Sequence, residues 1–231
     1  MIDKRDMRNI IRESLNMDSV EDTELLEESL VLQQKTFSLP TELLSQKNKK
    51  SHLELYENYV KAFNRVSAEL DGVDKSAANL NSSAFRSLKQ DEAYNMNAAY
   101  LHELFFNNIS DVQSEIAMDT LSFMRLERDF GTFDAWQEDF IACAVSARNG
   151  WVMTGFNTFT QRYMNVMVDL HSQGIPVGFY PVIVVDVWEH SYYRDYLRKR
   201  KSYVHAMMKE LNWEVIEDRF KRSEMIAKSL R

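Results

Sequence analysis

Residues 177–193 have the sequence VGFYPVIVVDVWEHSYY, and this stretch carries the clearest evidence of both fold and chemistry. Residues 177–185 are rich in β-branched and aromatic side chains, which is typical of a buried strand. Asp186 and His190 follow directly, four residues apart. Because a carboxylate and an imidazole offered together at a strand end suit a first-row metal, we predict an iron or manganese site here.

The first 150 residues predict helices. Apolar side chains recur with helical spacing in residues 41–70 and again in residues 91–106. Ser110 and Thr132 are candidate N-caps of two further helices, the first of which we expect to end near Phe130. Only six Gly and three Pro occur in the whole chain, so long helices are expected.

The composition changes after Gly150. Residues 151–157, 163–170 and 177–185 have the character of strands, and residues 193–231 return to a helical pattern. We therefore predict an α+β fold. Its N-terminal half is helical, and its C-terminal half combines a small three-stranded antiparallel sheet with helices.

This pattern predicts three parts of the chain. Residues 1–37 form a helical extension, because two short amphipathic patterns fall within residues 4–36. Residues 38–150 form a helical domain and residues 151–231 an α/β domain. The extension is either an arm that packs on the domain or a tether to a partner, and both alternatives stay open.

Composition limits the possible functions. The chain has 231 residues and a formal net charge of −7, which argues against a general nucleic-acid-binding protein. No apolar run approaches the roughly 20 residues that cross a bilayer, so no membrane segment is expected. Cys143 is the only cysteine, and the charged N-terminus shows no secretory signal. Together these features predict a cytoplasmic protein.

Residues 186–193, DVWEHSYY, resemble the Asp-Val-Trp-Glu-His-Ala-Tyr-Tyr motif of the iron/manganese superoxide dismutases, with Ser191 as the only change. A match that includes a Trp and a Tyr pair is far more specific than an isolated Asp-x-x-x-His pair. The resemblance extends over roughly residues 38–222. It implies a manganese or iron enzyme that converts superoxide to dioxygen and hydrogen peroxide, with Asp186 and His190 as metal ligands.

A second ligand is implied in residues 98–106, AAYLHELFF. This segment is similar to the Gly-His-x-Asn-His-Ser-Leu-Phe-Trp helix of the family, which places His102 at the position of a ligand. The segment departs from the family pattern at four positions, namely Ala99, Leu101, Glu103 and Phe106.

A third ligand is implied before Tyr59. The family places a ligand His eight residues before this Tyr, which corresponds to Ser51, whereas His52 lies only seven residues before it. Seven residues at about 100° each return to nearly the same helix face, but eight are turned away by about 80° unless a π-bulge absorbs one residue. Helix geometry therefore favours His52, in a helix from which such a bulge has been deleted.

The predicted metal site thus consists of His52, His102, Asp186 and His190. Manganese is slightly favoured over iron, because Gln173 stands three residues before Pro176, as in the Asn-Gln-Asp-x-Pro turn of manganese-type members.

Iron-type members more often carry a Gln where this chain has Ala98. The resemblance further implies that Gln173 tunes the metal and that the Tyr59 hydroxyl serves the proton relay. The alternatives are a plain turn residue at Gln173 and a packed helix residue at Tyr59.

Contacts between subunits are also implied. Glu189 and Tyr193 resemble family residues that reach the partner in a homodimer, where Glu189 would pair with the partner's His190. Leu55 stands where the family has a gateway His. Trp151 and Trp188 resemble the aromatic wall of the site, although either could be plain core.

The substrate implied by the resemblance is an anion, whereas the chain is acidic overall. Local cations must therefore steer superoxide, or else they form ordinary solvated faces. Two basic runs are candidates for steering: Arg194, Arg198, Lys199, Arg200 and Lys201, and Lys47, Lys49 and Lys50. The two remaining imidazoles, His171 and His205, are expected to be structural or surface residues.

Other metal-site classes fit less well. No His in the chain has Glu three residues before it, as a di-iron bundle needs, and His102 does not begin a His-Glu-x-x-His motif. The remaining alternative is a non-catalytic scaffold of the same family with a degraded site. The replacements at Leu55, Leu101, Glu103 and Phe106 favour that alternative, and the retained ligand set argues against it.

Overall fold

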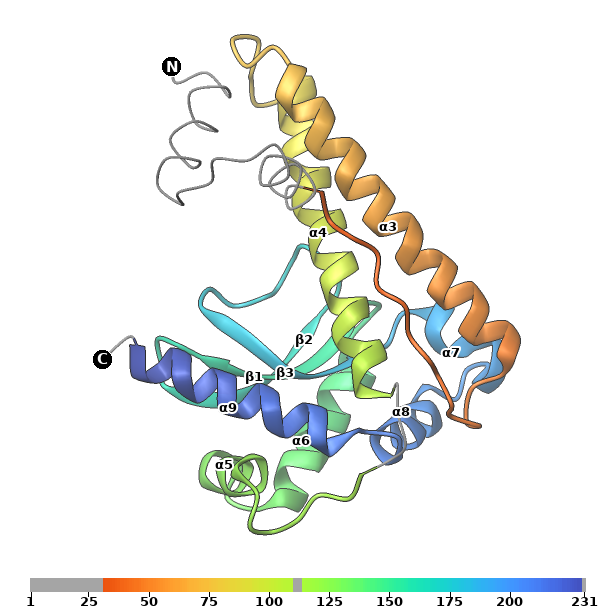
Figure 1. Ribbon diagram of the computed structural model, residues 1–231, viewed down its shortest axis with the longest axis vertical. Coiled ribbons are helices and arrows are strands. Elements are labelled where there is room, and N and C mark those ends of the chain that lie inside the picture. Colours follow the sequence, from red (N-terminus) through yellow and green to blue (C-terminus); the bar gives the residue numbers. More distant parts are fainter. Residues whose placement is uncertain (1–30, 110–113, 230–231) are drawn as a thin grey trace, which may run out of the picture. The chain divides into compact units, whose positions relative to one another are not determined.

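The computed structural model describes residues 31–109 and 114–229 (Figure 1). The chain forms two compact units, Met1–Gln34 and Lys35–Arg231, and the second contains all the described helices and strands. The helical patterns predicted within residues 4–36 lie almost entirely outside the described residues. Residues 31–36, which are described, are not helical.

Two long helices, α3 (Gln46–Gly72) and α4 (Ala84–Asn108), pack against each other. The Ser45 hydroxyl accepts a hydrogen bond from the N–H group of Asn48 in the first turn of α3, and the Ser83 hydroxyl accepts one from the N–H group of Arg86 in the first turn of α4. Both helices therefore begin at capping serines, which differ from the predicted starts at residues 41 and 91. Serine occurs in linkers as readily as at N-caps, so the sequence alone did not mark Ser45 and Ser83 as the starts of these helices.

Three strands form the predicted antiparallel sheet, and their order is β2-β1-β3. Their bounds are β1 (Trp151–Asn157), β2 (Arg162–Val168) and β3 (Phe179–Asp186). Trp151, the first residue of β1, pairs with Val168 on one side and with Asp186 on the other. The C-terminal ends of β2 and β3 therefore lie at the same end of the sheet, on either side of Trp151.

The remaining helices are α5 (Leu121–Phe130), α6 (Phe133–Ser146), α7 (Glu189–Tyr196), α8 (Arg200–Lys209) and α9 (Trp213–Ser229). Helices α4 and α9 pack on β3, while α5 and α6 pack on β2 (Figure 1). With seven helices and one sheet among the described residues, the predicted α+β class is confirmed.

Two of the predicted helix boundaries need correction. Thr132 caps α6 as predicted, but α5 is capped by Thr120, whereas Ser110 lies outside the described residues. The helical pattern predicted over residues 193–231 is interrupted at Leu197, which has a positive φ of 50°, and again after α8. In the described part of the chain, no helix has the length and apolar character that a membrane span requires.

The N-cap of α4 offers a test of this architecture. Ser83→Ala should lower the free energy of unfolding by about 1 kcal/mol, because the N–H group of Arg86 loses its acceptor. Urea unfolding followed by circular dichroism measures this change. Ser87→Ala on the exposed face of the same helix is the matched control. Equal losses in both variants would contradict the capping role of Ser83.

Candidate metal centre

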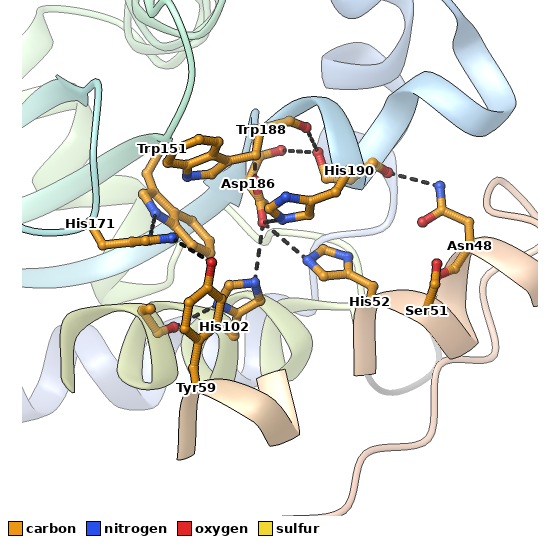
Figure 2. A network of polar contacts seen from close by, with 12 residues as sticks. Asn48, Ser51, His52, Tyr59, His102, Trp151, His171, Asp186, Trp188 and His190 are labelled. Carbon is orange, nitrogen blue, oxygen red and sulfur yellow. Dashed lines mark hydrogen bonds and ion pairs between the residues drawn. The ribbon is translucent and has the colours of Figure 1, made fainter. Parts of the chain in front are cut away.

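Four side chains from four elements converge at the end of the sheet where β3 finishes (Figure 2). His52 comes from α3, His102 from α4, Asp186 from the last position of β3 and His190 from the first turn of α7. One candidate ligand atom from each lies within 4.8 Å of the others. The fold thus brings together the four residues that the sequence predicts as ligands.

The carboxylate of Asp186 is the common partner of the three imidazoles. Its Oδ2 lies 3.0 Å from His52 Nε2, 3.1 Å from His190 Nε2 and 3.6 Å from His102 Nε2. The other oxygen, Oδ1, accepts a hydrogen bond of 2.8 Å from the Trp188 N–H group, which fixes the rotation of the carboxylate. Asp186 is fully buried, so these groups interact in a region of low dielectric.

The orientation of His102 leaves a lone pair facing the cluster. Its Nδ1 lies 2.6 Å from the carbonyl oxygen of Ala98, and because a carbonyl only accepts, Nδ1 must carry the proton. Nε2 then has a free lone pair, and it has no hydrogen-bond partner among the described residues. A buried nitrogen of this kind, beside two imidazoles and a carboxylate, fits a transition metal ion.

The electrostatics favour the protonation states that a metal requires. Burial lowers the pKa of His52 and lowers that of His102 much further, with the neighbouring His52 adding to the effect on His102. Burial alone would raise the pKa of Asp186, but its interactions with His190 and His52 outweigh burial and hold that pKa well below its usual range. At neutral pH the cluster therefore contains an ionised carboxylate beside neutral His52 and His102.

A second layer of polar contacts is centred on His171, which is buried in the turn after β2 (Figure 2). Its Nδ1 accepts a 2.9 Å hydrogen bond from Trp151 Nε1, so the neutral ring carries its proton on Nε2. Nε2 lies 3.2 Å from the Tyr59 hydroxyl and donates to it. The ring of Tyr59 in turn lies 5.4 Å from that of His102.

The comparisons with known proteins agree with this geometry. Residues 120–219 match the family model described as iron/manganese superoxide dismutases, C-terminal domain. An iron superoxide dismutase from Aquifex aeolicus is 34% identical over 171 residues, which cover 73% of this chain and 79% of the relative. The chain belongs to the iron/manganese superoxide dismutase family.

Relatives of this family are named for either metal. A manganese superoxide dismutase from Haloferax volcanii is 32% identical over 168 residues, covering 73% of this chain and 82% of the relative. An iron superoxide dismutase from Cupriavidus metallidurans is 33% identical over 180 residues, covering 77% of this chain and 88% of the relative.

The family pattern of a ligand eight residues before Tyr59 is not kept, yet His52 and Tyr59 both face the site. Residues 46–72 are α-helical throughout, so the seven-residue spacing returns both side chains to one face. Ser51 instead bonds through its hydroxyl to the carbonyl oxygen of Asn48 within the same helix. The helix between His52 and Tyr59 contains no bulge.

The structure places the two candidates for the second layer differently. Gln173 is exposed, and no hydrogen bond of its side chain is present among the described residues, whereas His171 is buried and bonded to Trp151 and Tyr59. The geometry therefore favours His171 over Gln173 for the position beside Tyr59. Val168 pairs with Trp151 in the hairpin of β1 and β2, and His171 follows only three residues later, so the turn after β2 brings His171 back to Trp151.

The other family positions are distributed as follows. Trp151 packs its ring 4.9 Å from His102, and Trp188 stacks 6.0 Å from His190, so both line the site. Glu189 and Tyr193, the predicted dimer contacts, are exposed.

Two cations of the predicted steering runs are engaged elsewhere. The buried ammonium group of Lys49 donates to the carbonyl oxygens of Leu39 and Thr41. The guanidinium group of Arg200 bonds to the carbonyl oxygens of Ala147 and Arg148. These two side chains are bonded to the backbone of loops, so they are not available for steering.

The buried state of His171 predicts a pH effect on the metal-free protein. Burial lowers its pKa to about 4, against an ordinary value of 6.5, so protonation favours the unfolded chain. The free energy of unfolding should therefore fall as the pH drops from about 6.5 to about 4, with His171 contributing a slope of up to about 1.4 kcal/mol per pH unit.

The variant His171→Gln should remove that part of the slope in urea unfolding measured across this range. His205→Gln, on the exposed face of α8, is the matched control and should keep the wild-type slope. Identical slopes in wild type and His171→Gln would contradict the buried neutral state of His171.

Proposed function

We propose that the protein is a superoxide dismutase that converts superoxide to dioxygen and hydrogen peroxide. A single manganese or iron ion would be held by His52, His102, Asp186 and His190. The observation that carries the proposal is the convergence of these four donors within 4.8 Å, with a buried carboxylate among three imidazole nitrogens. Membership of the family supports the same activity.

The bound metal would supply one-electron redox chemistry, and the chain's own residues prepare the site. The ionised carboxylate of Asp186 offsets positive charge, and the hydrogen bond from His102 Nδ1 to Ala98 orients that ring. The rings of Phe106 and Trp151 lie against His102 and limit the access of water. A dry, pre-oriented donor set of this kind favours reaction over solvent exchange.

Formation of hydrogen peroxide requires two protons, and Tyr59 is the best-placed donor. Burial raises the pKa of its hydroxyl, which therefore keeps its proton at neutral pH. His171 Nε2 donates to the Tyr59 oxygen and holds this ring beside His102. Tyr59 would thus be the catalytic acid, and His171 would fix its orientation.

We propose either metal as the cofactor. The preference for manganese rested on Gln173, which is exposed, while the relatives are named for iron and for manganese alike. The exposed Glu189 and Tyr193 make this face the proposed surface of a homodimer. The single Cys143 suits a reducing compartment, and we propose the cytoplasm.

Metal analysis tests the activity directly. The purified protein should hold about one manganese or iron per chain and dismutate superoxide, because the donor set forms one site. His190→Ala should lose both properties, whereas the exposed His205→Ala should keep both. If the wild-type protein stayed metal-free and inactive after incubation with either metal, the proposed activity would be wrong. The non-catalytic scaffold would then be the remaining alternative.

The dependence of the rate on salt tests substrate steering. Arg198, Lys199 and Lys201 belong to the basic run that follows the motif, and they contribute to the lining of one surface pocket together with Glu189. Because salt screens exposed charges, the rate at limiting superoxide should fall as ionic strength rises.

Replacing Lys199 and Lys201 together by Gln should lower the rate at low salt and flatten its salt dependence. Lys228→Gln, in the last turn of α9, is the control and should behave as wild type. A rate that is independent of salt in the wild-type protein would rule out steering.

A further inference from the structure

A second buried carboxylate, that of Glu103, lies next to the proposed ligand His102 on α4. Its side chain is only 7% exposed. Lys35 Nζ lies 2.5 Å from Oε2, and the Tyr56 hydroxyl donates a 3.0 Å hydrogen bond to Oε1. Both carboxylate oxygens are therefore engaged, as the burial of a charge requires.

These contacts close a ring. The backbone N–H group of Lys35 donates a 3.0 Å hydrogen bond to the Tyr56 oxygen, whose own proton goes to Glu103. The ammonium group of the same Lys35 returns to the other oxygen of Glu103. One residue of the segment before α3 is thus held at its backbone and at its side chain, by one residue of α3 and one of α4.

An aromatic layer connects this ring to the metal ligands. Phe37 packs its ring 5.6 Å from Tyr56 and 5.3 Å from Phe106. Phe106 in turn lies 4.9 Å from the ring of His52 and 5.9 Å from that of His102. In Figure 1 the segment that carries Lys35 and Phe37 runs, in red-orange, beside α4 and α3.

Helix geometry couples the ring to the ligands. Tyr56 follows His52 by four residues, which places the two side chains one turn apart on one face of α3. Glu103 directly follows His102 on α4. A rigid link between Tyr56 and Glu103 therefore limits how far the ligand-bearing parts of the two helices can separate.

We infer that Glu103 is a positioning residue, which acts with Lys35 and Tyr56 to fix the spacing of His52 and His102. This inference rests on the proposed function, because the spacing matters only if the two imidazoles hold one metal. It gives a role to a residue that departs from the family pattern. The network would slow the release of the metal rather than take part in the reaction.

The rate of metal release tests the inference. Protein loaded with manganese is mixed with excess chelator, and release is followed together with the electron paramagnetic resonance spectrum of the bound ion. Glu103→Ala should release manganese about ten-fold faster and alter the spectrum, as loss of groups that orient metal ligands does. The release rate of Glu103→Gln should lie between those of the wild type and Glu103→Ala. Its amide oxygen still accepts a hydrogen bond from Tyr56, but the side chain no longer carries a charge that pairs with Lys35.

A matched control separates positioning from general stability. Glu224→Gln breaks the ion pair with Arg125 between α9 and α5, away from the ligand helices, and should leave release and spectrum unchanged. Wild-type release rates and spectra in both Glu103 variants, or equal acceleration in Glu224→Gln, would overturn the inference. A wild-type protein that binds no manganese or iron would instead overturn the proposed function itself.

Discussion

The buried carboxylate of Asp186 is the constraint on which the rest of the site depends. An ionised group without solvent is stable only if charges or hydrogen bonds surround it. The protein meets this requirement with the imidazoles of His52 and His190 and with the N–H group of Trp188. The same arrangement places three nitrogens at one oxygen, so the need to stabilise a charge and the need to bind a metal are met by one geometry.

The sheet and the helix pair α3 and α4 position the groups that surround Asp186. Because Trp151 pairs with Asp186 and with Val168, one end of β1 sets the position of both the carboxylate and the turn that carries His171. The packing of α3 against α4 then brings the imidazoles of His52 and His102 to this end of the sheet. Asn48 adds a direct link from α3 to α7 through the carbonyl oxygen of Ser191.

Much of this site could be predicted from the sequence, because its spacing is local. Asp186 and His190 lie only four residues apart, at the end of β3 and in the first turn of α7, and His52 and Tyr59 share a face of α3. His171 could not be identified in this way, since its role depends on contacts with Trp151 and Tyr59 that are distant in sequence. The helix starts were missed for a related reason, because a serine side chain caps a helix only when the chain direction allows it.

The departures from the family pattern on α4 support a maintained site more than a decayed one. Random loss would leave buried groups unpaired, yet Glu103 has partners at both oxygens and Phe106 packs on two of the proposed ligands. An unpaired carboxylate at this depth would destabilise the fold, so the burial of Glu103 depends on its contacts with Lys35 and Tyr56. In this chain the contacts of Glu103 with Tyr56 and Lys35 therefore link the two ligand helices directly.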